Sequence, residues 1–395
     1  MNSRLSRSAK LGLLVVLVFA VAQTLLLGQS PNDEKQKRIK QLMDAKQAHD
    51  AKLAKKALVT LHVGATGNAI FTEAARVFVD RGMDGLAGTV APPDLVNRLQ
   101  QRPKMPLTVN VGVSGDESLP AWDLRKKIPD MPVRNQNPCN NCWIFGAIGA
   151  FEGNFLFQKT LGQDVDASEQ YVVNCLERGQ DNCGQGGWPS IVFDFLISKG
   201  TRARSEPGMA YEGRMRPCDA AAPTKFKAVK WKYVNENTPI PSNQELKRAL
   251  VEFGALAVAV KSTPAFVIYP GDVFDDEPSD ANSRSFTKEM INHAVVLIGW
   301  DDAKEASNGR KGAWLVRNSW GPSWGGTEKG HVWIAFDNNN IGFGAMYVQA
   351  TGDAVNPTPD KKCPCPARVV PNYNEEINSR INYWMKTPFA FPTPK

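Results

Sequence analysis

Apolar residues are spaced very unevenly along this chain of 395 residues. Between residues 31 and 56 they are sparse among Lys, Ala, Gln and Asp, which predicts a solvated helix or a flexible stalk without a core of its own. From residue 120 to about residue 350 the apolar pattern is dense and globular. We therefore expect the functional domain at 119–351, separated from its flank by the turn-rich stretch 112–120.

Local patterns within this region predict a helical half followed by a β-rich half. Residues 142–159 have apolar side chains at helical spacing, which predicts a central buried helix. Ser242 and Glu245 have the spacing of a capping box, and the helix that they open is expected to end near Phe253. Short apolar runs between Gly and polar residues predict strands at 255–260, 293–300, 312–318 and 330–336. The sequence therefore predicts an α+β domain in two parts.

Residues 1–30 have the pattern of an export signal. Three basic residues precede the apolar run 11–27. Small residues offer a cleavage site within that run, but apolar residues continue beyond them, which leaves a cleaved signal peptide and an uncleaved membrane anchor both open. In either case the remainder leaves the cytoplasm as a secreted, periplasmic or lumenal protein, and its cysteines can be oxidised.

The composition narrows the classes of protein to consider. Hydrophobic residues make up 42%, aromatic residues 9% and charged residues 22%, which excludes wholesale disorder and a many-pass membrane protein. The 47 Lys and Arg against 40 Asp and Glu give a net charge of +7, but no basic stripe is interleaved with aromatic residues. We therefore expect no nucleic-acid partner. The Pro-rich residues 352–395 are expected to be an extension outside the core.

Two cysteines, Cys139 and Cys142, stand at the start of the predicted buried helix. A cysteine reacts as the thiolate, and the N-terminus of a helix lowers the pKa of a thiol, so Cys142 is the candidate nucleophile. The same spacing suits a thiol–disulfide oxidoreductase, but the tryptophan of that motif precedes the first cysteine, whereas Trp143 follows the second. A zinc site would need a second knuckle, which Cys175 and Cys183 do not form. We expect neither a metal nor a cofactor.

A nucleophilic cysteine needs a base, and the base needs a group that orients it. Two of the four histidines, His49 and His62, lie in the N-terminal flank. His331 has no polar partner nearby in the sequence and is expected to be structural. His293, which opens a predicted strand, is therefore the candidate base. Asn318 comes just before two tryptophans that can shield a hydrogen bond to the imidazole from water, and is the candidate orienting group.

Six segments together resemble the papain-like cysteine peptidases: NQNPCNNCWIFGA, SEQYVVNC, CGQGGWP, YEGRMRPC, NHAVVLIGW and VRNSWGPSWGG. The chain order of Cys, His and Asn is also that of this family. The resemblance covers residues 119–350. It implies a helical part with the nucleophile helix, a β-barrel-like part, and an active-site cleft between them. It also implies a peptidase that acts on protein or peptide substrates, with endopeptidase activity as the default because no long insertion blocks one end of the cleft.

The resemblance implies roles for four residues. Cys142 would be the nucleophile, His293 the base that becomes the acid for the leaving amine, and Asn318 the residue that orients the imidazole. Gln136 would join the backbone N–H of Cys142 in an oxyanion hole. A preformed thiolate–imidazolium pair would follow. Transglutaminase-like enzymes use an Asp in the third place, and no Asp fills it here.

The resemblance also implies how substrate is held. Gly186 and Gly187 would pair with the backbone of an extended peptide. An apolar pocket would take the second residue before the cut, with a preference for Leu, Val or Phe. The residues expected to line this pocket are Pro189, Ala259, Ala294 and Met346. Asn292 and Trp320 are expected to contact substrate as well.

Six further cysteines remain beside the candidate nucleophile. The family pattern implies the disulfides Cys139–Cys183 and Cys175–Cys218. Cys363 and Cys365 are left in the C-terminal extension without an assigned role.

Several positions depart from the family pattern. Asn137-Pro138 and Asn140-Asn141 replace Gly-Ser pairs beside the nucleophile, and Ile144 replaces a small residue. The flank 31–118 lacks the spaced Glu, Arg, Phe and Asn of the common inhibitory pro-segment, so a pro-segment and a tethering stalk both remain open. A catalytically inactive peptide-binding module on the same fold is the main alternative function. Retention of all four candidate catalytic residues argues against it.

Overall fold

The computed structural model describes residues 31–57, 72–100, 118–128, 131–158, 165–205, 207–219, 225–280 and 288–351. The expected export signal at 11–27 and the C-terminal cysteines lie outside these residues, as does most of the boundary stretch 112–120. Within the described ranges, no helix is both long enough and apolar enough to cross a membrane.

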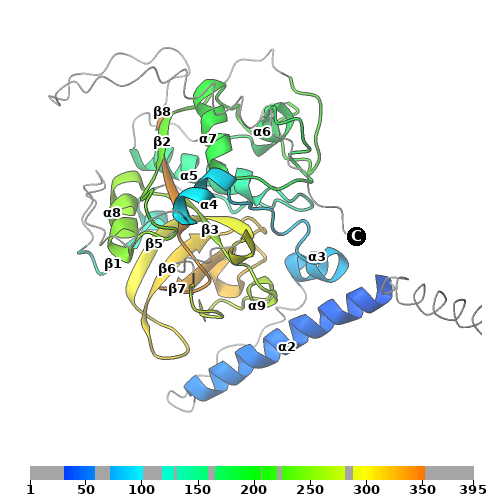
Figure 1. Ribbon diagram of the computed structural model, residues 1–395, viewed down its shortest axis with the longest axis vertical. Helices are drawn as coiled ribbons and strands as arrows, with labels where there is room; N and C mark the ends of the chain where they lie inside the picture. The colour runs from blue at the N-terminus through cyan, green and yellow to red at the C-terminus, as the bar shows by residue number, and fades with distance from the viewer. Residues whose placement is uncertain are drawn as a thin grey trace, which may run out of the picture.

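Helices dominate the first half of the described chain and strands the second half (Figure 1). The α-helices are α2 (Pro31–Ala57), α3 (Glu73–Arg81), α4 (Pro93–Gln100), α5 (Cys142–Gln158), α6 (Glu169–Cys175), α7 (Pro189–Ser198), α8 (Asn243–Phe253) and α9 (Pro264–Val267). The strands are β1 (Ala121–Asp123), β2 (Lys227–Tyr233), β3 (Leu256–Val260), β4 (Val273–Phe274), β5 (His293–Glu305), β6 (Lys311–Arg317), β7 (His331–Ala335) and β8 (Phe343–Thr351). Short 3-10 helices are Leu124–Lys126, Lys288–Met290 and Gly326–Glu328.

The strands form one sheet in the order β2-β8-β3-β5-β6-β7-β4, with β1 paired to β5. All neighbours are antiparallel except β4 and β7. Figure 1 shows α6 and α7 gathered on one side of the molecule and β5, β6 and β7 on the other. The predicted α+β domain in two parts is confirmed.

The expected central helix is α5, and almost all of its side chains are buried. It packs against β3, β5 and β8. Gly149 lets the helix approach the sheet, because a Cβ there would lie 2.7 Å from Cγ2 of Val296. The helix thus forms the seam between the two parts, and its first residue, Cys142, faces the junction with β5.

Most of the local predictions are confirmed. The capping box of α8 is present, since Ser242 accepts from the N–H of Glu245 and the Glu245 side chain accepts from the N–H of Ser242. The four predicted strands correspond to β3, β5, β6 and β7. Strands β1, β2, β4 and β8 were not predicted, and each of them pairs with a strand that is distant in the sequence.

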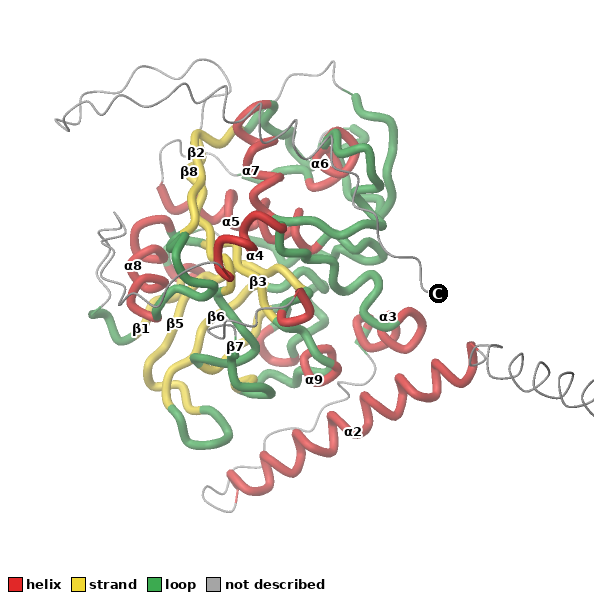
Figure 2. Tube along the Cα trace, in the orientation of Figure 1, coloured by secondary structure: helices red, strands yellow, loops and turns green. Residues whose placement is uncertain are grey.

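The N-terminal flank lies against the domain. Helix α2 contacts α3 and α9, and Figure 1 shows it lying along the β-rich side. The helix expected between 31 and 56 is present, and its sparse apolar residues leave only Leu42 buried among its described side chains. The stretch between α3 and α4 is a loop, as Figure 2 shows, and it crosses the junction of the two parts.

Candidate active site

Cys142 is the first residue of α5 and is completely buried. It is the free cysteine of the described region. Its position directs the unpaired N–H groups of the first helical turn toward the sulfur, which favours the thiolate whenever the site is open to water. The neighbouring Cys139 is bonded to Cys183, so the C-x-x-C pair cannot act as a dithiol in this state.

His293 opens β5 and Asn318 follows β6, so adjacent antiparallel strands bring the two together. The imidazole Nε2 and the Asn318 Oδ1 are 2.8 Å apart. Since an amide oxygen only accepts, Nε2 carries the proton and Nδ1 keeps its lone pair. Asn318 Oδ1 also accepts from the N–H of Ser319, at 2.8 Å, which fixes the carboxamide. Trp320 stacks at 4.9 Å from the imidazole ring and shields this hydrogen bond.

Gln136 is buried beside these groups. Its Oε1 accepts from the hydroxyl of Ser319 at 2.7 Å, which orients the Nε2 donor away from Ser319. That donor reaches the carbonyl of Cys139 at 3.0 Å and the carbonyl of Gly85 at 3.4 Å. The amide can therefore present an N–H to a carbonyl oxygen of a chain that lies in the junction, which is what an oxyanion hole requires.

Burial favours the neutral form of the site. Burial raises the pKa of the Cys142 thiol to about 11, and burial lowers the pKa of His293 to about 4 despite its hydrogen bond to Asn318. At neutral pH a thiol and an uncharged imidazole are therefore favoured. The preformed thiolate–imidazolium pair expected from the sequence is not the favoured state here, because the chain segment over the site excludes water.

That segment is 83–91, which lies between α3 and α4. Its backbone runs along the junction of the two parts and makes hydrogen bonds to both of them. The N–H groups of Gly88 and Thr89 both donate to the carbonyl of Asn292 at 2.9 Å. Gly187 donates to the carbonyl of Gly88 at 2.9 Å and accepts from Val90 at 3.0 Å. Thr89 and Gly187 form a parallel β-bridge in this pairing. Two residues that the sequence assigned to substrate binding thus bind the backbone of the flank instead.

The segment passes directly over the candidate nucleophile. The Thr89 hydroxyl and the Cys142 sulfur are 3.2 Å apart. Gly88 fits there because it has no side chain: a Cβ would lie 1.9 Å from the carbonyl oxygen of Asn140. The indole of Trp320 donates to the carbonyl of Leu86 at 2.9 Å. Segment 83–91 therefore covers the thiol and makes close contacts around it.

Three of the four residues expected to form an apolar pocket belong to one buried cluster. Ala259 is paired with Ala294 across β3 and β5, and both belong with Met346 to one buried cluster. Pro189 opens α7 and is buried. Ala91 and Leu95 of the flank join that same apolar cluster.

Two disulfides staple the helical part. Cys139 is bonded to Cys183 and Cys175 to Cys218, which are the pairs that the resemblance implied. The first bridge holds the loop that contains Gly186 and Gly187 next to the loop that precedes the nucleophile. His331, expected to be structural, is bonded through Nδ1 to the carbonyl of Glu328 at 3.1 Å.

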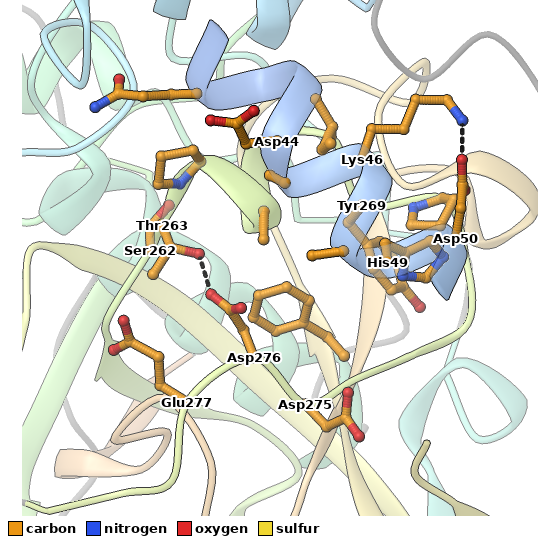
Figure 3. A pocket seen from close by; sticks show the side chains of 18 of the residues that line it. Asp44, Lys46, His49, Asp50, Ser262, Thr263, Tyr269, Asp275, Asp276 and Glu277 are labelled. Atoms are coloured by element: carbon orange, nitrogen blue, oxygen red, sulfur yellow. Dashed lines mark hydrogen bonds and ion pairs between the residues drawn. The ribbon is translucent and has the colours of Figure 1, made fainter. Parts of the chain in front are cut away.

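A second hollow lies away from these groups. It is a cavity of about 530 Å³ between α2 and residues 261–277 (Figure 3). The hydrogen bonds drawn in Figure 3 join residues of the same wall, Lys46 to Asp50 on α2 and Thr263 to Asp276 opposite. The cavity thus marks a place where α2 stands off from the domain, and no candidate catalytic residue lines it.

Sequence reasoning missed the covering segment. Its contacts come from backbone N–H and C=O groups, which every residue carries, and only Thr89 meets the thiol with a side chain. The one available signal was the cluster of small residues, Gly85, Ala87 and Gly88, between two helical patterns. Small residues there permit the close approach that the cleft demands.

Known proteins resemble this chain in sequence and in fold. The model of the papain family cysteine proteases matches residues 119–351. Mouse (Mus musculus) cathepsin K is 32% identical over 219 residues, which span 55% of this chain and 60% of that protein. Cysteine proteinase 2 of Entamoeba histolytica is 31% identical over 238 residues, which span 58% of this chain and 68% of that protein. The matched part of this chain thus spans only about 60 to 70% of the length of each relative.

A solved structure extends the likeness of the fold to the flank. Digestive procathepsin L 3 of the Tenebrio molitor larval midgut superposes with a TM-score of 0.56 at 22% identity, over 82% of this chain and 93% of that chain. At this level of identity the likeness concerns the fold alone. Because the family model covers more than half of the sequence, this chain belongs to the papain family of cysteine proteases.

Proposed function

We propose that this protein is an exported cysteine peptidase, made as a latent precursor, that hydrolyses peptide bonds through a thioester on Cys142. The observation that carries the proposal is the 2.8 Å bond between His293 Nε2 and Asn318 Oδ1 beside a buried thiol at a helix N-terminus. That bond leaves Nδ1 of His293 as the proton acceptor, and no described group satisfies this buried atom.

The reaction begins when Nδ1 of His293 takes the thiol proton and the Cys142 sulfur attacks the carbonyl carbon of the substrate. The carbonyl oxygen becomes an oxyanion, which accepts hydrogen bonds from the Gln136 side chain and the backbone N–H of Cys142. The C–N bond then breaks, and the imidazolium gives its proton to the departing amine. Water, deprotonated by the same imidazole, attacks the thioester. The acid product leaves and the thiol is restored.

Segment 83–91 is proposed to keep the precursor latent. It covers Cys142 and uses Asn292 and Gly187, which would otherwise bind substrate. It pairs in parallel with Gly187. We infer that residues 31–118 are a pro-segment and that processing near residue 119 releases them.

The apolar cluster around Ala259, Ala294 and Met346 supports a preference for Leu, Val or Phe at the second residue before the cut. Export is supported by the apolar run at 11–27 and by two disulfides, which persist in oxidising compartments. Mapping the N-terminus of the exported protein distinguishes a cleaved signal peptide from an uncleaved membrane anchor.

Intact mass after treatment with an epoxide directed at thiols tests this proposal. The processed protein should gain one adduct, the Cys142→Ala variant none, and the new N-terminus should lie near residue 119. A peptide library should show Leu, Val or Phe at the second position before the cut. An Arg-dominated profile would overturn the pocket assignment. Processed protein with free Cys142 but neither adduct nor hydrolysis would leave the peptide-binding module as the function.

A further inference from the structure

Glu73, the first residue of α3, is held by two carboxamides of the loop that precedes the nucleophile. Asn135 Nδ2 donates to one carboxylate oxygen at 2.9 Å, and Asn137 Nδ2 donates to the other at 2.7 Å. Both oxygens of one carboxylate are thus bound by two uncharged donors. This is the geometry by which a protein recognises a carboxylate, because each oxygen receives its own N–H.

The loop itself orients one of the two donors, Asn135. Asn135 Oδ1 accepts from the backbone N–H of Asn137 at 3.1 Å, so the amide of Asn135 must turn its NH2 outward. Asn135 also bridges to Trp320, next to the candidate catalytic histidine. Between the two asparagines, Gln136 is buried and fixed by Ser319. The loop is therefore rigid where it presents the two donors.

The path of segment 83–91 along the cleft shows on which side of the nucleophile Asn135 and Asn137 lie. Val90 lies at Gly187, the place proposed for residues before the cut, and Thr89 lies at Cys142. Leu86 lies beyond them at Trp320, and Gly85 donates its N–H to the side chain of Asn140. The asparagine pair flanks Gln136 and adjoins Trp320, and so lies on the side of the nucleophile away from Gly187. That is the side of the leaving group.

We propose that Asn135 and Asn137 form a carboxylate-binding site on the leaving-group side of the cleft. In the precursor it holds Glu73 of the same chain. In the processed enzyme it selects substrates with an acidic side chain after the scissile bond. The inference rests on the proposed peptidase function and adds a specificity that the family pattern does not carry, since Asn137 stands where that pattern has Gly.

Neighbouring contacts give the same loop a wider role in holding the flank. Arg81, at the end of α3, donates to the carbonyl of Pro138 at 3.0 Å. Asn140 accepts from Gly85 and donates to the carbonyl of Gly184 at 3.1 Å. Three of the positions that depart from the family, 137, 138 and 140, thus contact the flank. At 137 and 140 the departing side chain itself makes the contact, whereas at 138 a backbone carbonyl makes it.

Matched peptides test the site in the processed enzyme. Each peptide keeps the same residues before the cut and carries either Glu or Gln at one of the first four positions after it. We expect Glu to be favoured over Gln by about five-fold in kcat/KM at one position, the size of a net hydrogen-bond gain. In Asn137→Asp, which keeps the side-chain volume, the ratio should fall below one and a Lys peptide should gain.

A control and a second readout separate the outcomes. Asn308→Ala, on an exposed turn far along the sequence, should keep the wild-type ratio. In the full-length precursor, Glu73→Gln should speed epoxide labelling of Cys142 about three-fold, because one held contact of the flank is weakened. Cleavage of the Gln peptides with no Glu preference at any position would sink the carboxylate site alone. No cleavage of any peptide and no labelled thiol would sink the peptidase function, and this site with it.

Discussion

Segment 83–91 and helix α2 belong to the same flank but are held in opposite ways. The segment is fitted into the cleft through its backbone, with four hydrogen bonds to Asn292 and Gly187. Among the described side chains of helix α2 only Leu42 is buried, and the helix stands over a cavity of about 530 Å³. The difference indicates that a few residues keep the thiol covered, whereas the long helix contributes attachment.

The charges of α2 support this reading. Its ion pairs include Lys35 with Asp80 at 2.7 Å and Lys40 with Asp44, and both are largely exposed. Exposed pairs of this kind contribute little, at most about 1 kcal/mol each. Leu42 is the buried residue among the described side chains of the helix, and it belongs to the same apolar cluster as Phe78 of α3 and Tyr269 of the domain.

The largest expected effect concerns the reactivity of the covered thiol. Burial raises the pKa of Cys142 to about 11, so at pH 8 only about one molecule in a thousand carries the thiolate. The full-length chain should react with iodoacetamide about 1,000-fold more slowly than processed protein, and its rate should rise about tenfold per pH unit from pH 7 to 10. Rates are read by mass spectrometry at each pH. A rate in the full-length chain that is flat near neutral pH would contradict a covered, neutral site.

The next largest effect is expected from a side chain introduced into segment 83–91. In Gly88→Val, a Cβ would lie 1.9 Å from the Asn140 carbonyl, so segment 83–91 can no longer seat. Epoxide labelling of the unprocessed chain should accelerate about 100-fold, as overpacking of a close contact implies. Met43→Val on the exposed face of α2 is the control and should label like the wild type. Equal labelling of Gly88→Val and wild type would show that the inhibition lies elsewhere in the flank.

These two tests address the part of the molecule that the sequence predicted least well. Helix α5, the capped helix α8 and four strands follow from local spacing, because burial on one face and capping leave a signature in the residues themselves. The sequence could indicate Cys142, His293, Asn318 and Gln136 because a thiol, an imidazole and a carboxamide must act together in the reaction. The family motifs contain each of these residues.

The covering segment could not be found in that way. Gly88 and Val90 bind through backbone atoms, which carry no side-chain signature, and the partners lie about 100 to 200 residues further along the chain. The protonation state could not be read from motifs either, since the pKa of Cys142 and that of His293 depend on water that the segment excludes. The roles of Asn135 and Asn137 depend on where α3 lies, which only the tertiary structure defines.

The smallest expected effect concerns α2 itself. Leu42→Ala truncates the side chain that is buried among those described for the helix, and it should weaken the docking of the helix by about 2 kcal/mol. Limited proteolysis should then cut within α2 at least ten-fold faster, because the helix leaves the domain more often. Labelling of Cys142 in the same sample should change less than two-fold, since the four backbone bonds of segment 83–91 remain. Labelling that rises in step with the cutting of α2 would mean that the helix and the cleft segment leave together, and that the flank is released as a single unit.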